Sequence, residues 1–545
     1  MKAFWKVALF VLFPLCAIST YGQETGITGV VTDPQGAIIQ GAKITAKQTG
    51  GSSFNSVTND HGVYVIPNLT AEEYAVTVNA PNFTITQKKI LLLVGQMAQV
   101  DFMLTVATGS TEVVVESSND LAIDTTGSEV AGNITPQEVQ DIPVNGRSYV
   151  ELSALVPGIK SNAFGNAPVS GPGGASEGDA ETGKFQVTLD GLQLSQDSVG
   201  SSFGQPKVSQ DAISQFQIIT DRFDATAGRS AGVYVNVQTK TGSNQMHGSG
   251  FGYFRNSFFN AADPIVKSVI PFADEQYGGT LGGKIIRDKL WYFGSYEGEH
   301  QPSTASESPI ITTTPGVNVI AGGSTVYTHP SIYKVNEYLG RADYQVGANN
   351  HFFLRGDGFT QDTSFVAQSS EPSQSYYSTV SAAGYVFDWD KNIHPNLIND
   401  FHAGFHYFQF GNFPFFPDNS LVITLPSVTV GEPYNEPEVF DQYTQQYRDD
   451  LFWLKGKHSI KLGGEYLYTL HAGAFPQYLR GGLTTCTPAA GATPNYAAMF
   501  PSGTLDPSTW NYTAINNYCS ASESYTQAFG NYSIDILRNI IGVWI

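Results

Sequence analysis

The sequence has few charged residues for its length. Only 14% of its 545 residues are Asp, Glu, Lys or Arg, whereas a soluble globular protein carries roughly a quarter. The charge is also one-sided, with 28 basic and 48 acidic residues and a formal net charge of −20. This balance, and the lack of a basic stripe, argue against nucleic acid as a partner, because phosphates would be repelled.

Long apolar runs are also missing. Beyond the N-terminus no segment approaches the roughly 20 apolar residues that a membrane-spanning helix needs. Hydrophobic residues nevertheless make up 41% of the chain and aromatic residues 12%, which is enough to bury a core and excludes general disorder. Glycine, tyrosine and phenylalanine, at 56, 28 and 34 residues, take the place of the missing charge.

The first 22 residues have the pattern of an export signal. Lys2 and Lys6 precede an apolar stretch, Val7 to Ile18, and small residues follow it. The pattern predicts a secretory signal peptide over residues 1–22. A membrane anchor is the alternative, but the apolar run is short and contains Pro14.

Cysteine is scarce, with three residues in the whole chain. Cys16 falls within the signal, which leaves Cys486 and Cys519 in a stretch rich in Gly, Thr, Pro and Asn. In an exported chain such a pair is a candidate disulfide, since a metal site would need further ligands nearby.

Residues 23–106 show short alternating strands divided by turn sequences such as Asp33-Pro34-Gln35-Gly36 and Asn59-Asp60-His61-Gly62, which predict a small β-sandwich. The predicted strands are Ile27–Thr32, Ala42–Lys47, Val63–Ile66, Tyr74–Val78 and Val100–Leu104. Gly29 to Asp33 and Thr58 to Tyr64 resemble the carboxypeptidase regulatory-like domain, which has a transthyretin-like, carbohydrate-binding-like fold. Glu72-Glu73 departs from that family, which usually has a glycine there.

No catalytic chemistry accompanies this domain. None of the ten histidines begins an HxxE or HExxH sequence, so a carboxypeptidase-like zinc site is not expected. We therefore predict a non-catalytic accessory domain, and no catalytic residue, cofactor or metal ligand for the chain.

A β-prone segment follows in the linker 107–119. It consists of Thr111, Glu112, Val113, Val114, Val115 and Glu116. On pattern alone it could be the last strand of the sandwich. From its position it resembles a TonB box, which implies pairing by β-augmentation with a TonB-type energy-transducing protein of the inner-membrane complex.

Residues 120–242 have a mixed α/β pattern. Helices are predicted from Thr135-Pro136-Gln137-Glu138 and around Asp211 to Phe216, and strands at Gln186–Leu189 and Val233–Thr239. A stretch rich in Gly and Ser, residues 162–182, is predicted to be a flexible loop. Ile142 to Ser148, Val187 to Gly191 and Ala227 to Gly232 resemble the plug domain of TonB-dependent outer-membrane receptors, and most closely the Oar-like group.

From residue 243 onward, segments of about ten residues alternate with period two. Tyr338, Ala342 and Tyr344 fall on one face, opposite Arg341 and Asp343. Apolar-out, polar-in alternation is typical of a transmembrane antiparallel β-barrel strand. A soluble sandwich would alternate too, but Tyr277 to Gly283, Phe293 to Gly298 and Gly456 to Glu465 resemble the Oar-like barrel.

The barrel of residues 243–545 is expected to be incomplete. We count about ten strand candidates, whereas transporters with a plugged lumen have 22 strands. Tyr525 to Ile536 resembles a family strand, but Leu537 to Ile545 loses the pattern. The sequence therefore predicts a truncated or frameshifted product of a longer gene.

Four local motifs carry no prediction of chemistry. Gly174 to Gly178 matches a GxSxG elbow without the strand and helix that it needs. Gly278 to Lys284 resembles a phosphate loop but has Ile285 where a hydroxyl is required. Arg355-Gly356-Asp357 is expected to point its charges into the lumen. His402 and His406 share a strand face and are read as lumen residues.

Together these features predict a mainly β protein of the cell outer membrane, with its N-terminal domain in the periplasm. The resemblance implies a TonB-dependent receptor or transporter that contacts outer-membrane lipid and takes up a small or polymeric extracellular ligand. The substrate is not identified; carbohydrate-related compounds and peptides are the classes considered. The alternative is a secreted or surface carbohydrate-binding adhesin made of β-sandwiches.

Overall fold

The structure is a computed structural model of the chain. It describes residues 25–48, 51–107, 113–116, 130–142, 144, 147, 149–156, 159–161, 168–170, 186–195, 207–221, 233–262, 267–307, 327–366, 374–415, 422–424, 429–430, 433, 436–456, 458–474, 482–484, 495, 498, 501, 511, 513–514, 524–526 and 536–544. The predicted signal peptide, the GxSxG motif and both mature cysteines lie outside the described residues.

The N-terminal part is a β-sandwich, as predicted. One sheet has the order β4-β1-β7 with β8 beside β1, and the other has the order β3-β2-β5-β6-β9. The strands are β1 (Gly26–Thr32), β2 (Lys43–Gln48), β3 (Ser53–Val57), β4 (Val63–Ile66), β5 (Glu73–Asn79), β6 (Ile85–Leu91), β7 (Met97–Gln99), β8 (Phe102–Met103) and β9 (Val113–Glu116). Alternate residues of the facing strands, such as Ile44, Val76 and Val78, are buried between the sheets.

The last predicted strand of the sandwich, Val100–Leu104, is shorter than expected. The chain runs as β7 and then β8, and both pair parallel to β1. Between them the Asp101 carboxylate accepts a hydrogen bond from the Val30 backbone N–H at 2.8 Å. At this point a side-chain oxygen, and not a backbone carbonyl, accepts the hydrogen bond from β1. The strand beside β1 is therefore interrupted between β7 and β8.

The next part, which we call the inner unit, comprises the described residues between 130 and 240. Its main sheet has the order β10-β15-β16-β13-β14, and β11 pairs with β12. The elements are β10 (Val130–Ile134), α2 (Pro136–Asp141), β11 (Ile159–Ser161), β12 (Pro168–Ser170), β13 (Gln186–Leu189), β14 (Leu192–Gln193), β15 (Ile213–Asp221) and β16 (Tyr234–Thr239), with 3₁₀ helices at Tyr149–Leu155 and Gln210–Ala212. The strands predicted at 186–189 and 233–239 are confirmed as β13 and β16.

The helix predicted from Thr135 is confirmed as α2. Thr135 is the N-cap, its hydroxyl accepts the Glu138 backbone N–H, and the Glu138 carboxylate accepts the Thr135 backbone N–H. This capping box, with Pro136 at the first helical position, satisfies the free donors that begin a helix.

The helix predicted around Asp211 to Phe216 is wrong. Residues 210–212 form one 3₁₀ turn, and β15 begins at Ile213. β15 pairs with β10 at one edge and with β16 at the other. Residues 212–219 are all buried, so both faces of the strand are covered. A strand buried on both faces has no period-two alternation, and its sequence cannot be distinguished from that of a buried helix by periodicity.

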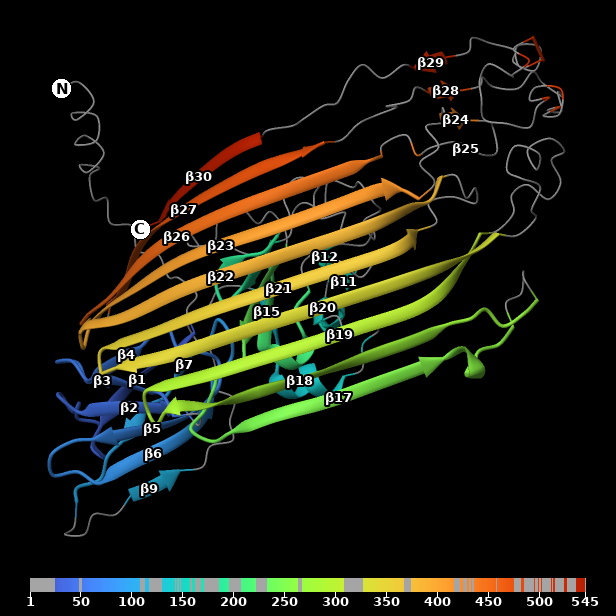
Figure 1. The fold of residues 1–545 in the computed structure, drawn as a ribbon. Coiled ribbons are helices and arrows are strands. Elements are labelled where there is room, and N and C mark those ends of the chain that lie inside the picture. Colours follow the sequence, from blue (N-terminus) through green and yellow to red (C-terminus); the bar gives the residue numbers. More distant parts are fainter. Residues whose placement is uncertain are drawn as a thin grey trace, which may run out of the picture.

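The largest part, which we call the wall, is one curved antiparallel sheet of ten strands in the order β17-β18-β19-β20-β21-β22-β23-β26-β27-β30 (Figure 1). Its strands are β17 (His247–Asn256), β18 (Ala273–Ile286), β19 (Leu290–Glu307), β20 (Tyr327–Val346), β21 (Asn350–Val366), β22 (Tyr376–His394), β23 (Leu397–Pro414), β26 (Glu438–Lys455), β27 (His458–Ala474) and β30 (Ile536–Trp544). A separate small sheet contains β24 (Val422–Thr424), β25 (Thr429–Val430), β28 (Gly482–Thr484) and β29 (Ser524–Thr526).

The predicted alternation is confirmed on the central strands β20 and β21. On β20 the outward Tyr338 and Tyr344 are 50% and 43% exposed, whereas the inward Arg341 and Asp343 are 4% and 3% exposed. Arg355 is likewise buried and ion-paired to Asp357 on the inner side of β21. These buried charges of β20 and β21 therefore lie on the concave face, where the inner unit lies.

The prediction for the last residues is wrong in part. The segment from Leu537, expected to lose the strand pattern, belongs to β30, which pairs antiparallel with β27. Ile, Val and Trp in this segment favour an extended chain even without regular alternation. Of the strand predicted at 525–536, only residues 525, 526 and 536 lie in described strands.

The wall is an open sheet, because no pairing joins β17 to β30 within the described ranges. At one end, short turns connect the strands, as at residues 287–289 and 347–349, whereas at the other end β19 stops at Glu307 and β20 starts at Tyr327, 20 positions later in the sequence. The sandwich contacts the short-turn end, where the Asn59 amide donates to the Gly456 carbonyl at 2.8 Å. Among the helices in the described part of the chain, none combines the length and hydropathy needed to span a bilayer.

Candidate functional site

The inner unit meets the wall through a two-residue hairpin. Asp190 and Gly191 connect β13 to β14, and both have positive φ, 45° and 83°. This is the conformation of a type I′ turn, for which Asp-Gly is a preferred sequence. The Asp190 carboxylate accepts the backbone N–H and the hydroxyl of Thr239 at 2.9 and 2.8 Å. The turn therefore holds a carboxylate rigidly at the surface of the inner unit.

Two arginines of the wall face this carboxylate. Arg341 and Arg355 are directly opposite on β20 and β21, an arrangement that is unfavourable for like charges. Asp190 lies between them, with Oδ1 3.5 Å from Arg341 Nη1 and Oδ2 3.1 Å from Arg355 Nη1. Asp343 and Asp357 complete the cluster, at 2.8 Å from Arg341 and 2.9 Å from Arg355. Asp190 of the inner unit thus pairs with both arginines, in addition to the carboxylate that the wall itself supplies to each of them.

This environment changes the acidity of Asp190. Burial would raise the pKa of the carboxyl, but the two arginines and the hydrogen bonds from Thr239 outweigh burial and lower that pKa. Asp190 is therefore ionised at neutral pH, and the ion pairs between the inner unit and the wall are present.

A second contact has the opposite polarity. Arg147 of the inner unit donates to Glu297 of β19 at 3.0 Å and to Asp211 at 2.9 Å. Its guanidinium also lies 4.2 Å from the centre of the Phe251 ring. Lys207 of the inner unit donates to the hydroxyl of Tyr333 on β20 at 2.8 Å. Both charge signs therefore link the inner unit to the wall.

Hydrogen bonds join the sandwich to the inner unit and to Thr241, which directly follows it. The Gln215 amide donates to the Leu92 carbonyl at 3.0 Å, and the Thr241 hydroxyl donates to Glu72 at 2.7 Å. Burial raises the pKa of Glu72, and the hydrogen bond from Thr241 only partly offsets this. The contacts described here between the sandwich and the inner unit are therefore polar, and they form only when donor and acceptor are correctly aligned.

A cavity of about 220 Å³ lies where sandwich, inner unit and wall meet. Its lining includes Phe54 and Asn68 of the sandwich, Asp190 and Gln238 of the inner unit, and a series of wall residues. Those wall residues are Arg341, His351, Phe353, Asp388, Asp390, Asp400, Gln446, Arg448, Asp450, Lys461, Glu465 and Leu467. The cavity is thus a polar space at the short-turn end of the concave face.

The predicted TonB-box-like segment is described only in part. Thr111 and Glu112 lie outside the described residues, whereas residues 113–116 form β9. β9 pairs parallel with β6, from Ile85 opposite Val113 to Lys88 opposite Glu116, and is the last strand of its sheet. The position of β9 therefore agrees with the alternative considered from the sequence, a last strand of the sandwich. Within the described part of this sheet, β9 has a neighbour on one side only.

The remaining predicted groups do not form a site. The candidate disulfide residues Cys486 and Cys519 are outside the described residues. His402 and His406 are fully buried on the inner side of β23, as predicted, and His402 contacts Asp388 at 3.3 Å. The segment from Gly278 to Lys284 lies within β18, which forms a hairpin with β19 and not a phosphate loop.

Residues 238–330 and 307–539 match the family described as the outer membrane beta barrel domain, which together is more than half of the chain. The chain belongs to this family. Residues 26–105 match the carboxypeptidase regulatory-like domain. Membership in the outer membrane β-barrel family places the chain in the cell outer membrane.

Relatives support the resemblance to Oar-like TonB-dependent receptors. The TonB-dependent transporter Oar of Myxococcus xanthus is 26% identical over 298 residues, which cover 51% of this chain and 27% of the relative. The outer membrane transporter YddB of Escherichia coli has a similar fold, with a TM-score of 0.51 and 10% identity over 76% of this chain and 53% of that structure. This β-barrel protein thus spans about a quarter of one relative and half of the other.

Sequence reasoning missed the ion-pair cluster around Asp190. Asp190-Gly191 belongs to a stretch that resembles the family, and the sequence places Arg341, Asp343 and Arg355 on the inner face of their strands. Nothing in the sequence indicated that these residues meet. One signal was available in the sequence: charged residues are rare, and those of β20 and β21 fall on the inner face of their strands. Because a buried charge requires a partner, these residues could have been expected to pair with an opposite charge.

Proposed function

We propose that this outer-membrane β-barrel protein is a TonB-dependent receptor or transporter, and not an enzyme. The observation that carries the proposal is the inner unit on the concave face of the wall, linked to it by buried ion pairs at Asp190 and Arg147. A domain that blocks the lumen and is held there by ion pairs can keep the path closed, and it can move away when force breaks those pairs. In this proposal the inner unit, within residues 120–242, is the plug.

The orientation in the membrane follows from the connections. Outer-membrane barrels have short periplasmic turns and longer extracellular loops. The short-turn end, which the sandwich contacts, is then periplasmic, and the opposite end of the wall faces outward. The sandwich therefore lies in the periplasm, on the same side as an inner-membrane partner.

Force on the segment 111–116 would enter the inner unit at β10. This strand is the next described element along the chain and lies at one edge of its sheet, where it pairs with β15 alone. An edge strand loses the hydrogen bonds of one ladder when it is pulled away, whereas a central strand loses those of two. The first movement is therefore separation of β10 from β15.

The contact between inner unit and wall permits such movement. The apolar core of the inner unit reaches the wall only at a few side chains, among them Phe293, Leu339 and Val386. The other contacts described above are ion pairs and hydrogen bonds, whose groups can be solvated by water when they separate. A polar contact of this kind costs less to open in water than an apolar core of the same area.

The partner is proposed to bind by strand addition at the box-like segment. β9 is an edge strand, and an edge strand presents free backbone groups to a second chain. Val114→Pro removes one backbone N–H and fixes φ, whereas Val114→Ala keeps the N–H and leaves φ free. We expect the isolated periplasmic domain of the energy-transducing partner to bind the wild type and Val114→Ala, and not Val114→Pro. Equal binding of all three would overturn the assignment.

We also propose the division of the chain into a signal peptide (1–22), the sandwich (23–106), a linker (107–119), the plug (120–242) and a partial barrel (243–545). The substrate classes that we propose are carbohydrate-related compounds and peptides. A ligand-binding screen on cells that display the protein tests them. The comparisons lend no support to a secreted adhesin.

A further inference from the structure

A row of carboxylates crosses the inner side of the wall near its short-turn end. Asp390 of β22 is directly opposite Asp400 of β23, and Asp400 is directly opposite Asp450 of β26. Asp388 lies two residues before Asp390 on the same face. Like charges directly opposite one another destabilise a sheet, so this row needs compensation.

The neighbouring pair of opposed arginines has a counter-charge between its members. Arg341 and Arg355 have Asp190 of the inner unit between them. In the aspartate row, Arg448 lies 3.6 Å from Asp400 and 3.3 Å from Asp450. Lys461 also contacts Asp450, at 3.4 Å. The contacts of these two cations described here are thus to Asp400 and Asp450.

Two buried atoms at this site have no hydrogen-bond partner. One is Nδ1 of His351, a side chain that is directly opposite Asp390 and 7% exposed. Its nearest carboxylate oxygen, Asp390 Oδ2, is 3.6 Å away, beyond hydrogen-bond distance. The other is Oδ1 of Asp400, which is also 7% exposed. A buried histidine nitrogen and a buried carboxylate oxygen are left without the partners that buried polar atoms require.

The cavity at this site has an excess of negative charge. Its lining holds six carboxylates, those of Asp190, Asp388, Asp390, Asp400, Asp450 and Glu465, against the three cations Arg341, Arg448 and Lys461. With neutral histidine the lining carries a formal charge of −3. Such an excess of one sign in a concave space attracts a counter-ion.

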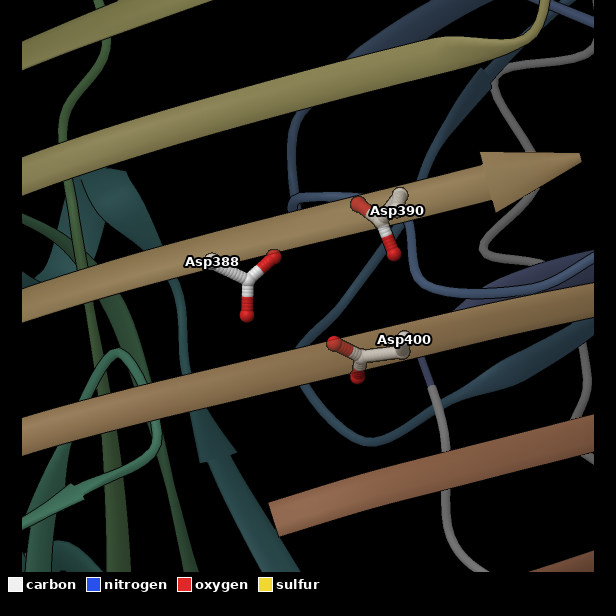
Figure 2. Close-up of side chains that lie close together, drawn as sticks. All are labelled: Asp388, Asp390 and Asp400. Atoms are coloured by element: carbon white, nitrogen blue, oxygen red, sulfur yellow. The ribbon is translucent and has the colours of Figure 1, made fainter. Parts of the chain in front are cut away.

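The geometry suits a single ion. Figure 2 shows Asp388 and Asp390 on one strand and Asp400 on the next, with their carboxylates turned toward a common space. One oxygen from each of the three lies within 4.8 Å of the other two. Because Ca²⁺ binds oxygen at 2.3–2.6 Å, oxygens on opposite sides of one ion are about 4.8 Å apart.

We propose that Asp388, Asp390 and Asp400 bind a divalent cation that prefers oxygen ligands, of the Ca²⁺ class. The ion links β22 to β23, and water in the cavity completes its coordination. Asn68 of the sandwich donates to Asp390 at 3.2 Å, so the site also lies at the contact between sandwich and wall. The cation therefore strengthens this contact.

Calcium binding to the folded full chain in detergent micelles, measured by isothermal titration with CaCl₂ after chelator treatment, tests the proposal. We expect one site with a dissociation constant of about 10⁻⁵ to 10⁻³ M. Asp400→Asn and Asp388→Asn should each weaken binding at least tenfold. Asp449→Asn is the matched control, because Asp449 is next to Asp450 on β26 but is exposed on the outer side.

A second readout does not depend on the variants. Thermal unfolding of the wild type should shift to higher temperature with CaCl₂, and the shift should be absent with the same ionic strength of NaCl. Absence of both binding and shift would overturn the proposal. Equal calcium affinity in Asp400→Asn, Asp388→Asn and Asp449→Asn would also overturn it, since the ion would then lie elsewhere.

Discussion

Asp190 Oδ2 lies 3.1 Å from Arg355 Nη1, across the boundary between the inner unit and the wall. Both side chains are nearly inaccessible to water, at 4% and 0% exposed. A buried ion pair stabilises only when both partners stay in place, because loss of one leaves an uncompensated charge. The relation of these two residues therefore fixes where the inner unit docks.

Removing the shared carboxylate should loosen the inner unit. Asp190→Asn leaves Arg341 and Arg355 opposite each other without the charge between them, and should lower the free energy of unfolding of the inner unit by about 3 kcal/mol. Urea unfolding in micelles, followed by proteolysis of the inner unit, measures the change. Asp362→Asn, on an exposed wall position, should change it by less than about 0.5 kcal/mol. Equal effects of the two variants would contradict the assigned role.

The same carboxylate predicts an acid dependence. Because the pKa of Asp190 is lowered in the folded state, its stabilising contribution is complete above the unfolded value of about 3.9 and is lost as the pH falls through the folded value. Amide exchange at Thr239, whose N–H donates to Asp190, should accelerate below about pH 4 after correction for intrinsic rates. In Asp190→Asn this additional acceleration should be absent; if it persists, another group is responsible.

Arg147 should contribute more to the stability of the inner unit than its partial exposure suggests. Arg147→Ala leaves Glu297 buried without one of its partners and should destabilise the inner unit by about 3 kcal/mol. Arg147→Lys keeps the charge but cannot reach Asp211 and Glu297 with one planar group, so it should recover only part of the loss. Arg255→Ala is the control, since Arg255 is 64% exposed and its ion pair with Asp274 is 3.9 Å long. Urea unfolding of each variant in micelles measures these differences. Full recovery by lysine would show that charge alone is needed.

The capping box of α2 gives a smaller, local prediction. Thr135→Ala removes the hydroxyl that accepts the Glu138 N–H and should cost about 1 kcal/mol, whereas Thr135→Ser should cost little. Hydrogen exchange of the α2 amides measures this. An unchanged exchange rate in Thr135→Ala would mean that packing, not the cap, holds the helix.

Local patterns predicted much of the fold. The alternation of Tyr338 with Arg341 identified both faces of a wall strand, and Thr135 with Glu138 identified the start of α2. The strand from Ile213 was missed because it is buried on both faces and therefore lacks the alternation of a half-buried strand.

The site was harder to predict because it depends on register. Whether Asp390 lies opposite Asp400 depends on the turn between β22 and β23, and a slip of one residue would move a side chain to the other face. The meeting of Asp190 with Arg355 also depends on how the inner unit docks, which no local pattern encodes. Inward-facing charges could be predicted, but their partners could not.

The central claim is that the inner unit is a mechanically releasable plug, and force spectroscopy on the membrane-embedded protein tests it most directly. The pulling handle would be Ser117→Cys in a chain with Cys486→Ser and Cys519→Ser. The account predicts a first low-force step as β10 leaves β15, then a second step that Asp190→Asn shifts to lower force while Asp362→Asn does not. Rupture of inner unit and wall in a single step, or a second step unchanged by Asp190→Asn, would contradict it.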